Sequence, residues 1–374
     1  MRVLVINCGS ATLKYKLFEQ GPTELEVLAT ETLEIERGYR AAVERAMAAL
    51  GAPPDVIAHR VVHGGGRLPE VVVVDPQVLK VLREVTPLAP LHNGPALEGI
   101  EATLGTGVPL VAALDTAFHA GLPPRAWRYA IPELPGVRRY GFHGWSHRYV
   151  TERYATLAAS PEPTVITLHL GGGCSAAAIL RGRSVDTSMG YSPLEGLIMG
   201  TRAGDLDPAI LTHLLHEGMS LAQLERMLHQ EAGLKALAGT TDVRELLRRG
   251  DPAAELALEI FCYRIRKYVG AYLAVLEGAE AIVFTGGIGE NAPEVRRRVC
   301  EGFGWAGLTL DTERNRRNGP RISTDGSGLA AYAIPTDEER LIARETLELM
   351  ERGPVARPRV GTTIDAGANG ESAV

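Results

Sequence analysis

The chain has 374 residues, a hydrophobic fraction of 45% and a formal net charge of −6 at pH 7. That length exceeds the roughly 250–300 residues at which a single core stops growing, so we expect two domains. The acidic balance argues against nucleic acid or an anionic membrane as the main partner, and no apolar run approaches the ~18 residues of a membrane span. The cysteines, which are scattered without a CxxC pair, fit a reducing cytoplasm; they are Cys8, Cys174, Cys262 and Cys300.

The first part of the chain alternates short strands with helices. Residues 1–19 are predicted to form a β-hairpin, because an apolar run turns at Gly9 and residues 13–19 alternate apolar and polar positions. The hairpin is followed by predicted strands at 56–62, 71–74 and 110–114 and by predicted helices at 39–50, 76–84 and 95–104.

A second unit is predicted to begin near Ser146, which we expect to cap a helix that ends near residue 159. A strand at 165–170, three glycines and a strand at 175–180 then repeat the opening hairpin, which indicates a weak internal duplication. The other predicted elements are helices at 208–218, 221–231, 252–276, from 293 and at 335–352, a strand at 281–285, and a disordered tail after about residue 353.

Three glycine-containing loops have the composition of phosphate-binding loops, because backbone N–H groups without a neighbouring Cβ can approach an anion. The first, at 7–14, adds the hydroxyl of Thr12 and the charge of Lys14, although an ordinary hairpin turn explains it equally well. The second, at 169–173, has more glycine than a bulged turn needs. The third, at 285–291, follows a buried strand as nucleotide-binding loops do, without matching the P-loop or G-x-G-x-x-G pattern.

Four charged or titratable residues lie on short connections: Arg60, Asp115, His143 and Arg202. For each residue alone, a surface ion pair, a helix cap or a buried histidine is the better explanation. Arg60, His143 and Arg202 also have glycines close by in the sequence, where a ligand can approach. Phosphoryl transfer spreads negative charge over three equatorial oxygens, so two arginines, a histidine and Mg²⁺ are suited to stabilise it.

At these loops the sequence resembles the acetate kinase family, within the superfamily of acetate kinases, sugar kinases and actin. The resemblance extends from residue 1 to about 349. It is carried by HRVVHGG at 59–65, PLAPLHN at 87–93, DTAFH at 115–119, YGFHG at 140–144, DTSMG at 186–190, MGTR at 199–202, TGGIGEN at 285–291 and PTDEE at 335–339.

The resemblance implies a role for each matching residue. Arg60 would hold the substrate carboxylate, Asp115 would be the catalytic aspartate, and His143 and Arg202 would stabilise the transition state. Asn7 and Glu338 would hold Mg²⁺ or Mn²⁺. The small apolar pocket for the substrate's methyl group would consist of Val62, Leu91, Phe142 and Pro193. The ATP contacts would be Lys14, His169, Leu170, Gly171, Gly172, Gly173, Asp242, Val243, Arg244, Gly287, Ile288, Gly289, Glu290 and Asn291.

The implied fold is α/β, with two duplicated ribonuclease H-like (actin-like ATPase) domains separated by a cleft. Residues 1–147 plus about 340–374 would form the acyl-substrate domain and residues 148–339 the nucleotide-binding domain. The implied protein is a cytoplasmic homodimer that transfers phosphate from ATP to acetate. Alternatives are a propionate or butyrate kinase on the same scaffold, a sugar kinase of the same superfamily, or a non-catalytic ATP-dependent protein. One departure stands out, because Gly172 replaces the family's asparagine.

Overall fold

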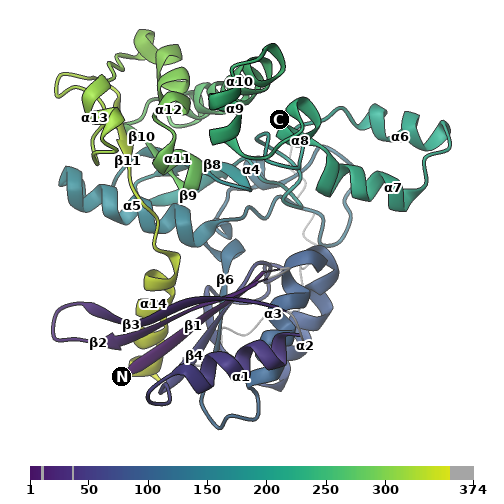
Figure 1. Cartoon of the computed structure of the whole chain (residues 1–374), viewed down its shortest axis with the longest axis vertical. Helices are drawn as coiled ribbons and strands as arrows, with labels where there is room; N and C mark the ends of the chain where they lie inside the picture. Colours follow the sequence, from purple (N-terminus) through teal and green to yellow (C-terminus); the bar gives the residue numbers. More distant parts are fainter. Residues whose placement is uncertain (10–11, 36–37, 354–374) are drawn as a thin grey trace, which may run out of the picture.

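The computed structural model describes residues 1–9, 12–35 and 38–353. Two lobes are visible, each built around one β-sheet (Figure 1). The strands of the first sheet are β1 (Arg2–Cys8), β2 (Thr12–Gln20), β3 (Leu25–Glu34), β4 (Val56–Val61), β5 (Val71–Val73) and β6 (Leu110–Leu114). Those of the second are β7 (Val165–Leu170), β8 (Cys174–Leu180), β9 (Arg183–Thr187), β10 (Ala281–Thr285) and β11 (Ala330–Ala333).

The two sheets share the order of five strands, and the first sheet adds β5 as an antiparallel edge strand beside β6. The first is ordered β3-β2-β1-β4-β6-β5, and the second, read from its β9 edge, is ordered β9-β8-β7-β10-β11. In each sheet the first three strands along the chain pair antiparallel, and two later strands add in parallel to the first of them. The duplication predicted from the two glycine-containing hairpins is therefore confirmed at the level of whole sheets.

Helices cover the sheets and connect their strands. The described α-helices are α1 (Tyr39–Ala49), α2 (Pro76–Val85), α3 (Pro90–Thr103), α4 (Pro124–Trp127), α5 (Gly144–Ala158), α6 (Pro208–His216), α7 (Leu221–Arg226), α8 (Gly233–Ala238), α9 (Val243–Arg249), α10 (Pro252–Val275), α11 (Gly286–Asn291), α12 (Pro293–Cys300), α13 (Thr312–Arg316) and α14 (Glu338–Arg352). Shorter 3₁₀ or π turns lie at Thr86–Leu88, Asp115–His119, Met227–Glu231 and Glu301–Ala306. Among the helices described, none combines the length and apolar character that crossing a bilayer requires.

Several predicted boundaries were wrong for identifiable reasons. Ser146 does not cap α5, because His143 precedes the helix in a left-handed conformation (φ 56°) and Ser146 lies buried inside it. Helix α3 begins at Pro90 and tolerates Pro95 in its second turn. The glycines after β10 start helix α11 instead of forming a loop. Helix α14 begins at Glu338 and not at the predicted residue 335, because Asp337 caps it by accepting a hydrogen bond from the Arg340 N–H. The predicted disordered tail lies outside the described residues.

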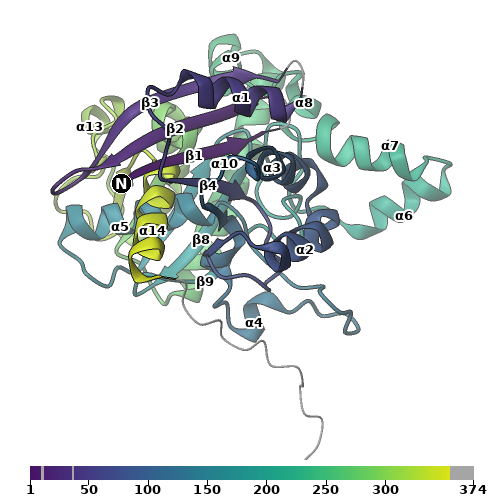
Figure 2. The ribbon, with the colours of Figure 1, turned by 90° about the horizontal axis from the view of Figure 1, so that it is seen from below.

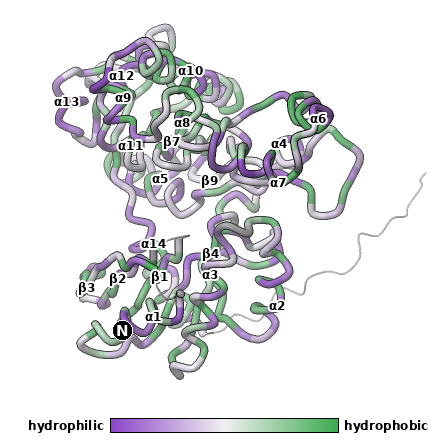
Figure 3. The backbone as a smooth tube through the Cα atoms, turned by 45° about the vertical axis from the view of Figure 1, so that its right-hand side comes forward, coloured by the Kyte–Doolittle hydropathy of each residue, from purple (hydrophilic) through white to green (hydrophobic). Residues whose placement is uncertain are grey.

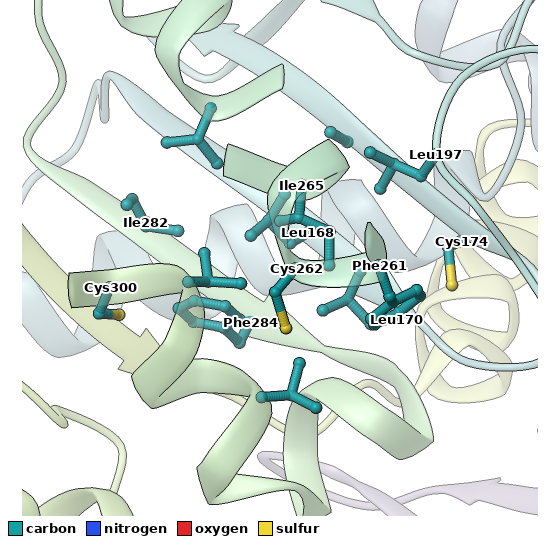
Figure 4. Packing of buried hydrophobic residues seen from close by; sticks show 14 of the residues in the cluster. Leu168, Leu170, Cys174, Leu197, Phe261, Cys262, Ile265, Ile282, Phe284 and Cys300 are labelled. Carbon is teal, nitrogen blue, oxygen red and sulfur yellow. The ribbon is translucent and has the colours of Figure 1, made fainter. Parts of the chain in front are cut away.

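The core of the second lobe forms where the buried strands β7 and β10 meet the 24-residue helix α10. Both strands are buried and mostly apolar because neighbours cover both of their faces. Each fully buried leucine or phenylalanine there stabilises the fold by about 1.5–3 kcal/mol. Figure 4 shows this packing between Leu168 and Leu170 of β7, Ile282 and Phe284 of β10, and Phe261 and Ile265 of α10.

Helix α14 brings the end of the described chain back to the first sheet. Leu341 and Ile342 of α14 share a buried cluster with Val3 and Val5 of β1. Lys16 of β2 holds the helix cap through an ion pair with Asp337 at 2.8 Å. Figure 2 shows α14 beside α5, and Figure 3 shows the two lobes from a third direction. The first turn of α14 therefore lies where the two lobes approach each other.

Candidate active site

The parallel strands of the first sheet direct their carboxyl ends to one edge. Strand β4 lies between β1 and β6, with Ile6 opposite His59 and Arg60 opposite Ala113. Asp115 directly follows β6, so its carboxylate emerges beside Arg60, which lies one residue before the end of β4. Residues that follow parallel strands gather at this edge in open α/β sheets.

Arg60 and Asp115 form a bidentate ion pair in the interior. Arg60 Nε donates to Asp115 Oδ1 at 2.9 Å and Nη2 donates to Oδ2 at 2.6 Å, while Asp115 is only 1% exposed. Nη2 also lies 3.1 Å from Glu338 Oε2 at the start of α14. Burial alone lowers the pKa of Arg60, but Asp115 and Glu338 outweigh it and the net pKa is raised. Nη1 makes no hydrogen bond within the described part of the chain and remains available to a ligand carboxylate.

A cavity of about 300 Å³ separates the lobes at this point and is lined by both of them. The structure brings most of the predicted transfer and substrate residues together around it, together with Cys8, Gly9 and Thr12 of the first hairpin. The Leu91 side chain lies outside the described part of the structure. The predicted residues on the cavity wall are Asn7, Lys14, Arg60, Val62, Asp115, Phe142, His143, Gly173, Pro193 and Arg202.

Two further cavity residues were missed by sequence reasoning. His92 and Met189 line the same cavity. Both lie inside motifs that carried the family resemblance, PLAPLHN and DTSMG. The motifs could therefore have pointed to these two residues, but the sequence suggested no chemical role for either. Met189 is fully buried and adds to the apolar side of the wall.

His143 is held in place by contacts on both sides of its ring. Its Nδ1 lies 2.9 Å from Ser175 Oγ, and its ring stacks on His169 with centroids 4.2 Å apart. Burial, with smaller contributions from His169, His147, Arg60 and Arg202, lowers the pKa of His143 well below its usual value. With this lowered pKa the His143 ring is uncharged at neutral pH in the protein without ligand, so it can act as a hydrogen-bond partner but not as a cation.

Arg202 and His143 meet over the glycine-rich turn after β7. Arg202 Nη1 donates to the carbonyl of Pro193 at 2.9 Å, which directs Nη2 toward the turn. A Cβ placed on Gly173 would lie 2.9 Å from Arg202 Nη2 and 3.3 Å from His143 Nε2. Gly173 thus leaves open the space on which both candidate stabilisers converge.

Gly173→Ala is expected to lower kcat by about 10-fold or more with little effect on stability. The new methyl group would displace the flexible end of Arg202 and the His143 ring, and a small misplacement of positioned groups is costly for transfer. The backbone φ of Gly173 is not in the left-handed region, so the fold tolerates alanine at this position. Gly270→Ala, at an open position inside α10, is the matched control; equal kcat in both variants would contradict the expectation.

Glycine is required at position 144 for backbone packing, and not for the approach of a ligand as the sequence suggested. A Cβ on Gly144 would overlap the carbonyl oxygen of Asp115. Glycine therefore allows the start of α5 to pack against the turn after β6, which fixes His143 relative to Asp115. It does not open a path for a ligand.

The predicted ATP residues of the two loops at 169–173 and 287–291 lie at the carboxyl edge of the second sheet, whereas Lys14 lies on β2 and residues 242–244 at the start of α9. His169 is opposite Thr285 in the β7–β10 ladder, so the turn at Gly171 and the start of α11 emerge side by side. Gly200 N–H donates to the carbonyl of Gly172 at 3.2 Å. Among these predicted ATP residues, Lys14 and Gly173 are the two that reach the cavity wall described above.

Some of these ATP candidates are engaged by the protein itself. Glu290 Oε1 accepts from the backbone N–H groups of Gly286 and Thr336, which ties α11 to the segment before α14. Asn291 Nδ2 donates to the carbonyl of Gly287 at 3.0 Å. Asp242 caps α9 and pairs with the exposed side chain of Arg244. Glu290 thus has a structural task, whereas the Arg244 guanidinium remains accessible to solvent.

Acid is expected to destabilise the protein as the pH falls below about 6.5. Several imidazoles are buried, which lowers their pKa in the folded state, so the unfolded chain binds more protons. As the pH falls from the unfolded-state pKa of such a histidine to its folded-state pKa, the free energy of unfolding decreases by about 1.4 kcal/mol per pH unit. Glu338 has the opposite sign, because burial raises its pKa to about 7, but it is a single carboxyl group. The imidazoles are those of His59, with pKa about 3, His63, His119 and His169, each about 4, and His143 and His147, well below 6.5.

Thermal unfolding measured between pH 8 and pH 4.5 checks this expectation. The Tm should be flat above pH 7 and fall steeply from about 6.5 toward 4.5. A Tm that stays level across that range would show that the imidazoles accept protons without unfolding.

Two sheets of one topology that enclose a cationic cavity define the ribonuclease H-like, actin-like ATPase class of fold. Two solved structures of kinases share this fold. The crystal structure of acetate kinase from Porphyromonas gingivalis matches with a TM-score of 0.85 and 36% identity over 93% of this chain and 99% of that one. A propionate kinase from Francisella tularensis matches with a TM-score of 0.86 and 35% identity over the same shares.

Sequence relatives give the particular family. The model of the acetokinase family matches residues 43–344. A protein named acetate kinase from Chloroherpeton thalassium is 43% identical over 94% of this chain and its own whole length. Another from Syntrophobacter fumaroxidans is 44% identical over 95% of this chain and 98% of its own. The chain belongs to the acetokinase family.

Proposed function

We propose that the protein catalyses reversible phosphoryl transfer from ATP to acetate, giving acetyl phosphate and ADP. The observation that carries the proposal is the single cavity in which Arg60, Asp115, His143 and Arg202 meet. Its cationic side suits the charge of a migrating phosphoryl group, and its apolar side, at Val62, Phe142, Met189 and Pro193, suits a short alkyl group.

The mechanism is direct in-line transfer. A carboxylate oxygen of acetate attacks the γ-phosphorus of ATP, the bond to the β,γ-bridging oxygen breaks, and ADP leaves. Arg60 Nη1 holds the acetate carboxylate, while Asp115 fixes the guanidinium by its bidentate contact. Acetate is already ionised at neutral pH, so Asp115 need not remove a proton. Arg202 supplies charge and His143 a hydrogen bond to the phosphoryl oxygens.

Asn7 and Glu338 fit a Mg²⁺ ion that arrives with the nucleotide. Glu338 Oε2 is buried and makes no hydrogen bond in the described structure, although it pairs with Arg60. Within the described residues no group of three or more His, Cys, Asp or Glu side chains is placed to hold a metal alone. Mg²⁺ needs only one or two carboxylates because phosphates and water complete its shell. When bound, it would neutralise charge on the phosphate oxygens; Mn²⁺ has the same ligand preference.

An acyl phosphate assay tests the function. With MgATP and hydroxylamine, the protein should form acyl hydroxamate from acetate at a rate far above that with glucose. Phosphorylation of glucose without hydroxamate would instead favour a sugar kinase. ATP binding without either product would leave a nucleotide-binding protein that lacks transferase activity.

Propionate is the second candidate acceptor, because a propionate kinase of 35% identity has the same fold with a TM-score of 0.86. One methylene group changes binding in an apolar pocket by only about 1–3 kcal/mol, so the two substrates are separated by the shape of a few side chains. Comparing kcat/KM for acetate, propionate and butyrate in the same assay decides between them.

Gly172→Asn is expected to raise kcat/KM for ATP by about 10–150-fold. The family's asparagine is absent here, and a Cβ on Gly172 would meet no atom within 4 Å, so a side chain can leave the backbone there without displacing a neighbour. A recovered hydrogen bond to a charged group contributes about 1.5–3 kcal/mol. Gly172→Ala adds only a methyl group and should give no gain; an equal gain in both variants would assign the effect to backbone stiffening.

The remaining family properties are inferred from the resemblance. We infer that residues 1–147 plus about 340–374, of which 354–374 lie outside the described residues, belong to one domain that moves against residues 148–339, and that closure excludes water from the cavity. The return of α14 to the first sheet supports that division. We also infer a cytoplasmic homodimer; light scattering after size-exclusion chromatography measures the oligomeric state.

A further inference from the structure

A line of buried side chains leads away from His143 into the second lobe. Ser175 Oγ lies 2.9 Å from His143 Nδ1 and 2.8 Å from His147 Nε2. His147 Nδ1 in turn lies 2.7 Å from Thr167 Oγ1. Ser175, His147 and Thr167 are each 0% exposed. These three residues, hereafter the relay, do not themselves line the cavity, and the relay reaches it only through His143.

When both imidazoles are neutral, the hydrogen bonds of the relay can be arranged in only two ways. A serine hydroxyl has one hydrogen to donate, and a neutral imidazole has one N–H and one acceptor nitrogen. If Ser175 accepted from both rings, its own buried hydrogen would have no acceptor among the described residues, which is costly. Ser175 therefore donates to one histidine and accepts from the other. If it donates to His143 Nδ1, then His147 Nε2–H donates to Ser175 and Thr167 donates to His147 Nδ1. In the reverse arrangement every donor and acceptor is exchanged, and the buried hydroxyl hydrogen of Thr167 is left without an acceptor among the described residues, which favours the first arrangement.

The two arrangements present different atoms to the cavity. In the first, His143 carries its hydrogen on Nε2, the nitrogen that converges with Arg202 Nη2 above Gly173. In the second, Nε2 is a bare acceptor, which cannot hydrogen-bond a phosphoryl oxygen. Stacking on His169 fixes the ring plane but does not select the tautomer.

We infer that Ser175, His147 and Thr167 are positioning residues that hold His143 in its Nε2–H tautomer, so that it donates a hydrogen bond to the migrating phosphoryl group. This inference rests on the proposed function for its effect on rate, but the tautomer itself is a property of the protein without substrate. Burial favours the relay because no water competes for the ring nitrogens. Lowered pKa values keep His143 and His147 neutral, as the directed chain requires.

Nitrogen-15 NMR of the histidine-labelled full-length chain distinguishes the tautomers, because protonated and bare ring nitrogens resonate far apart. His143 is assigned by comparison with His143→Asn. The wild-type protein should show a protonated Nε2 and a bare Nδ1. Ser175→Ala should shift the Nδ1 signal as the tautomers mix and should lower kcat about 10–100-fold, a range typical of residues that orient a functional histidine. The KM values for ATP and acetate should change less than about threefold.

Thr167 provides a test at the far end of the relay. Thr167→Val keeps the shape of the side chain but removes the hydroxyl, so it should move the His143 signals and lower kcat in the same direction as Ser175→Ala. Thr167→Ser keeps the hydroxyl and should restore both. Ser184→Ala is the matched control, because it removes a buried hydroxyl 2.7 Å from His119 Nδ1, outside the relay; it should leave the His143 signals unchanged.

Two results would overturn the inference. One is a wild-type His143 protonated on Nδ1, and the other is a Ser175→Ala or Thr167→Val protein with wild-type His143 signals and kcat. A wild-type protein that forms no acyl phosphate would instead overturn the proposed function, while the NMR comparison would still test the relay.

Discussion

Asp115→Asn is expected to lower kcat by about 10²–10³-fold while leaving the affinity for ATP within about threefold. The amide keeps the shape of the carboxylate but loses its charge, and its NH₂ group would face a guanidinium that has no acceptor. Arg60 would then lose one of its two hydrogen bonds to residue 115 and rotate away from the acetate carboxylate. The nucleotide candidates lie mainly on the second sheet, so ATP binding should persist.

Asp325→Asn is the control for that prediction. Asp325 also accepts a bidentate pair, from Arg314 at 2.6 and 3.0 Å, but its side chain is 77% exposed and lies outside the cavity wall. We expect unchanged kcat there. Turnover is measured by hydroxamate formation and ATP affinity by titration calorimetry. Wild-type turnover in Asp115→Asn would refute the role assigned to the Arg60 pair.

Arg202→Ala is expected to reduce kcat by about 10³-fold, the lower end of the effect of a transition-state arginine in phosphoryl transfer. Arg202 Nη1 is anchored on the Pro193 carbonyl and Nη2 faces the open space above Gly173. Because His143 is neutral, Arg202 supplies the positive charge on this side of the cavity. Arg202→Lys keeps the charge but lacks a second nitrogen for the anchor, so it should recover only part of the rate.

Steady-state kinetics separate this effect from a loss of binding. The kcat should fall with little change in KM for ATP, since the interaction strengthens in the transition state. Arg226→Ala, which removes a surface ion pair with Glu231 at 3.1 Å, should stay within about twofold of wild type. A matched fall in Arg226→Ala, or an Arg202→Ala protein changed only in KM, would contradict the assigned role.

The strands that were predicted best are those buried on both faces. Residues 110–114, 165–170 and 281–285 were predicted with the observed bounds, because a continuous apolar run ended by a turn residue leaves little ambiguity. Strand β3 was missed although Leu25, Val27, Ala29 and Leu33 fall on alternate positions, and most of its residues are exposed. Its strand conformation is imposed by pairing with β2, which is a tertiary effect.

The sequence alone indicated which residues belong to the candidate site. Its glycine-containing loops, with arginines and histidines nearby, differ in composition from ordinary connections. It also indicated the duplication, since the second hairpin repeats the first. Only the tertiary structure decided that Arg60 and Asp115 pair. That contact depends on β4 and β6 being parallel neighbours, and the order of strands in a sheet is not written in any one of them.

The reason for each glycine and the relay behind His143 were likewise decided only by the folded structure. Gly144 allows backbone contact with Asp115, whereas Gly173 leaves room for Arg202 and His143. Thr167, Ser175 and His147 attract no attention in the sequence, because hydroxyls and histidines are common and these are separated by up to 28 positions. Hydrogen bonds among buried groups depend on distances of a few tenths of an ångström, and only close packing of strand on helix sets those distances.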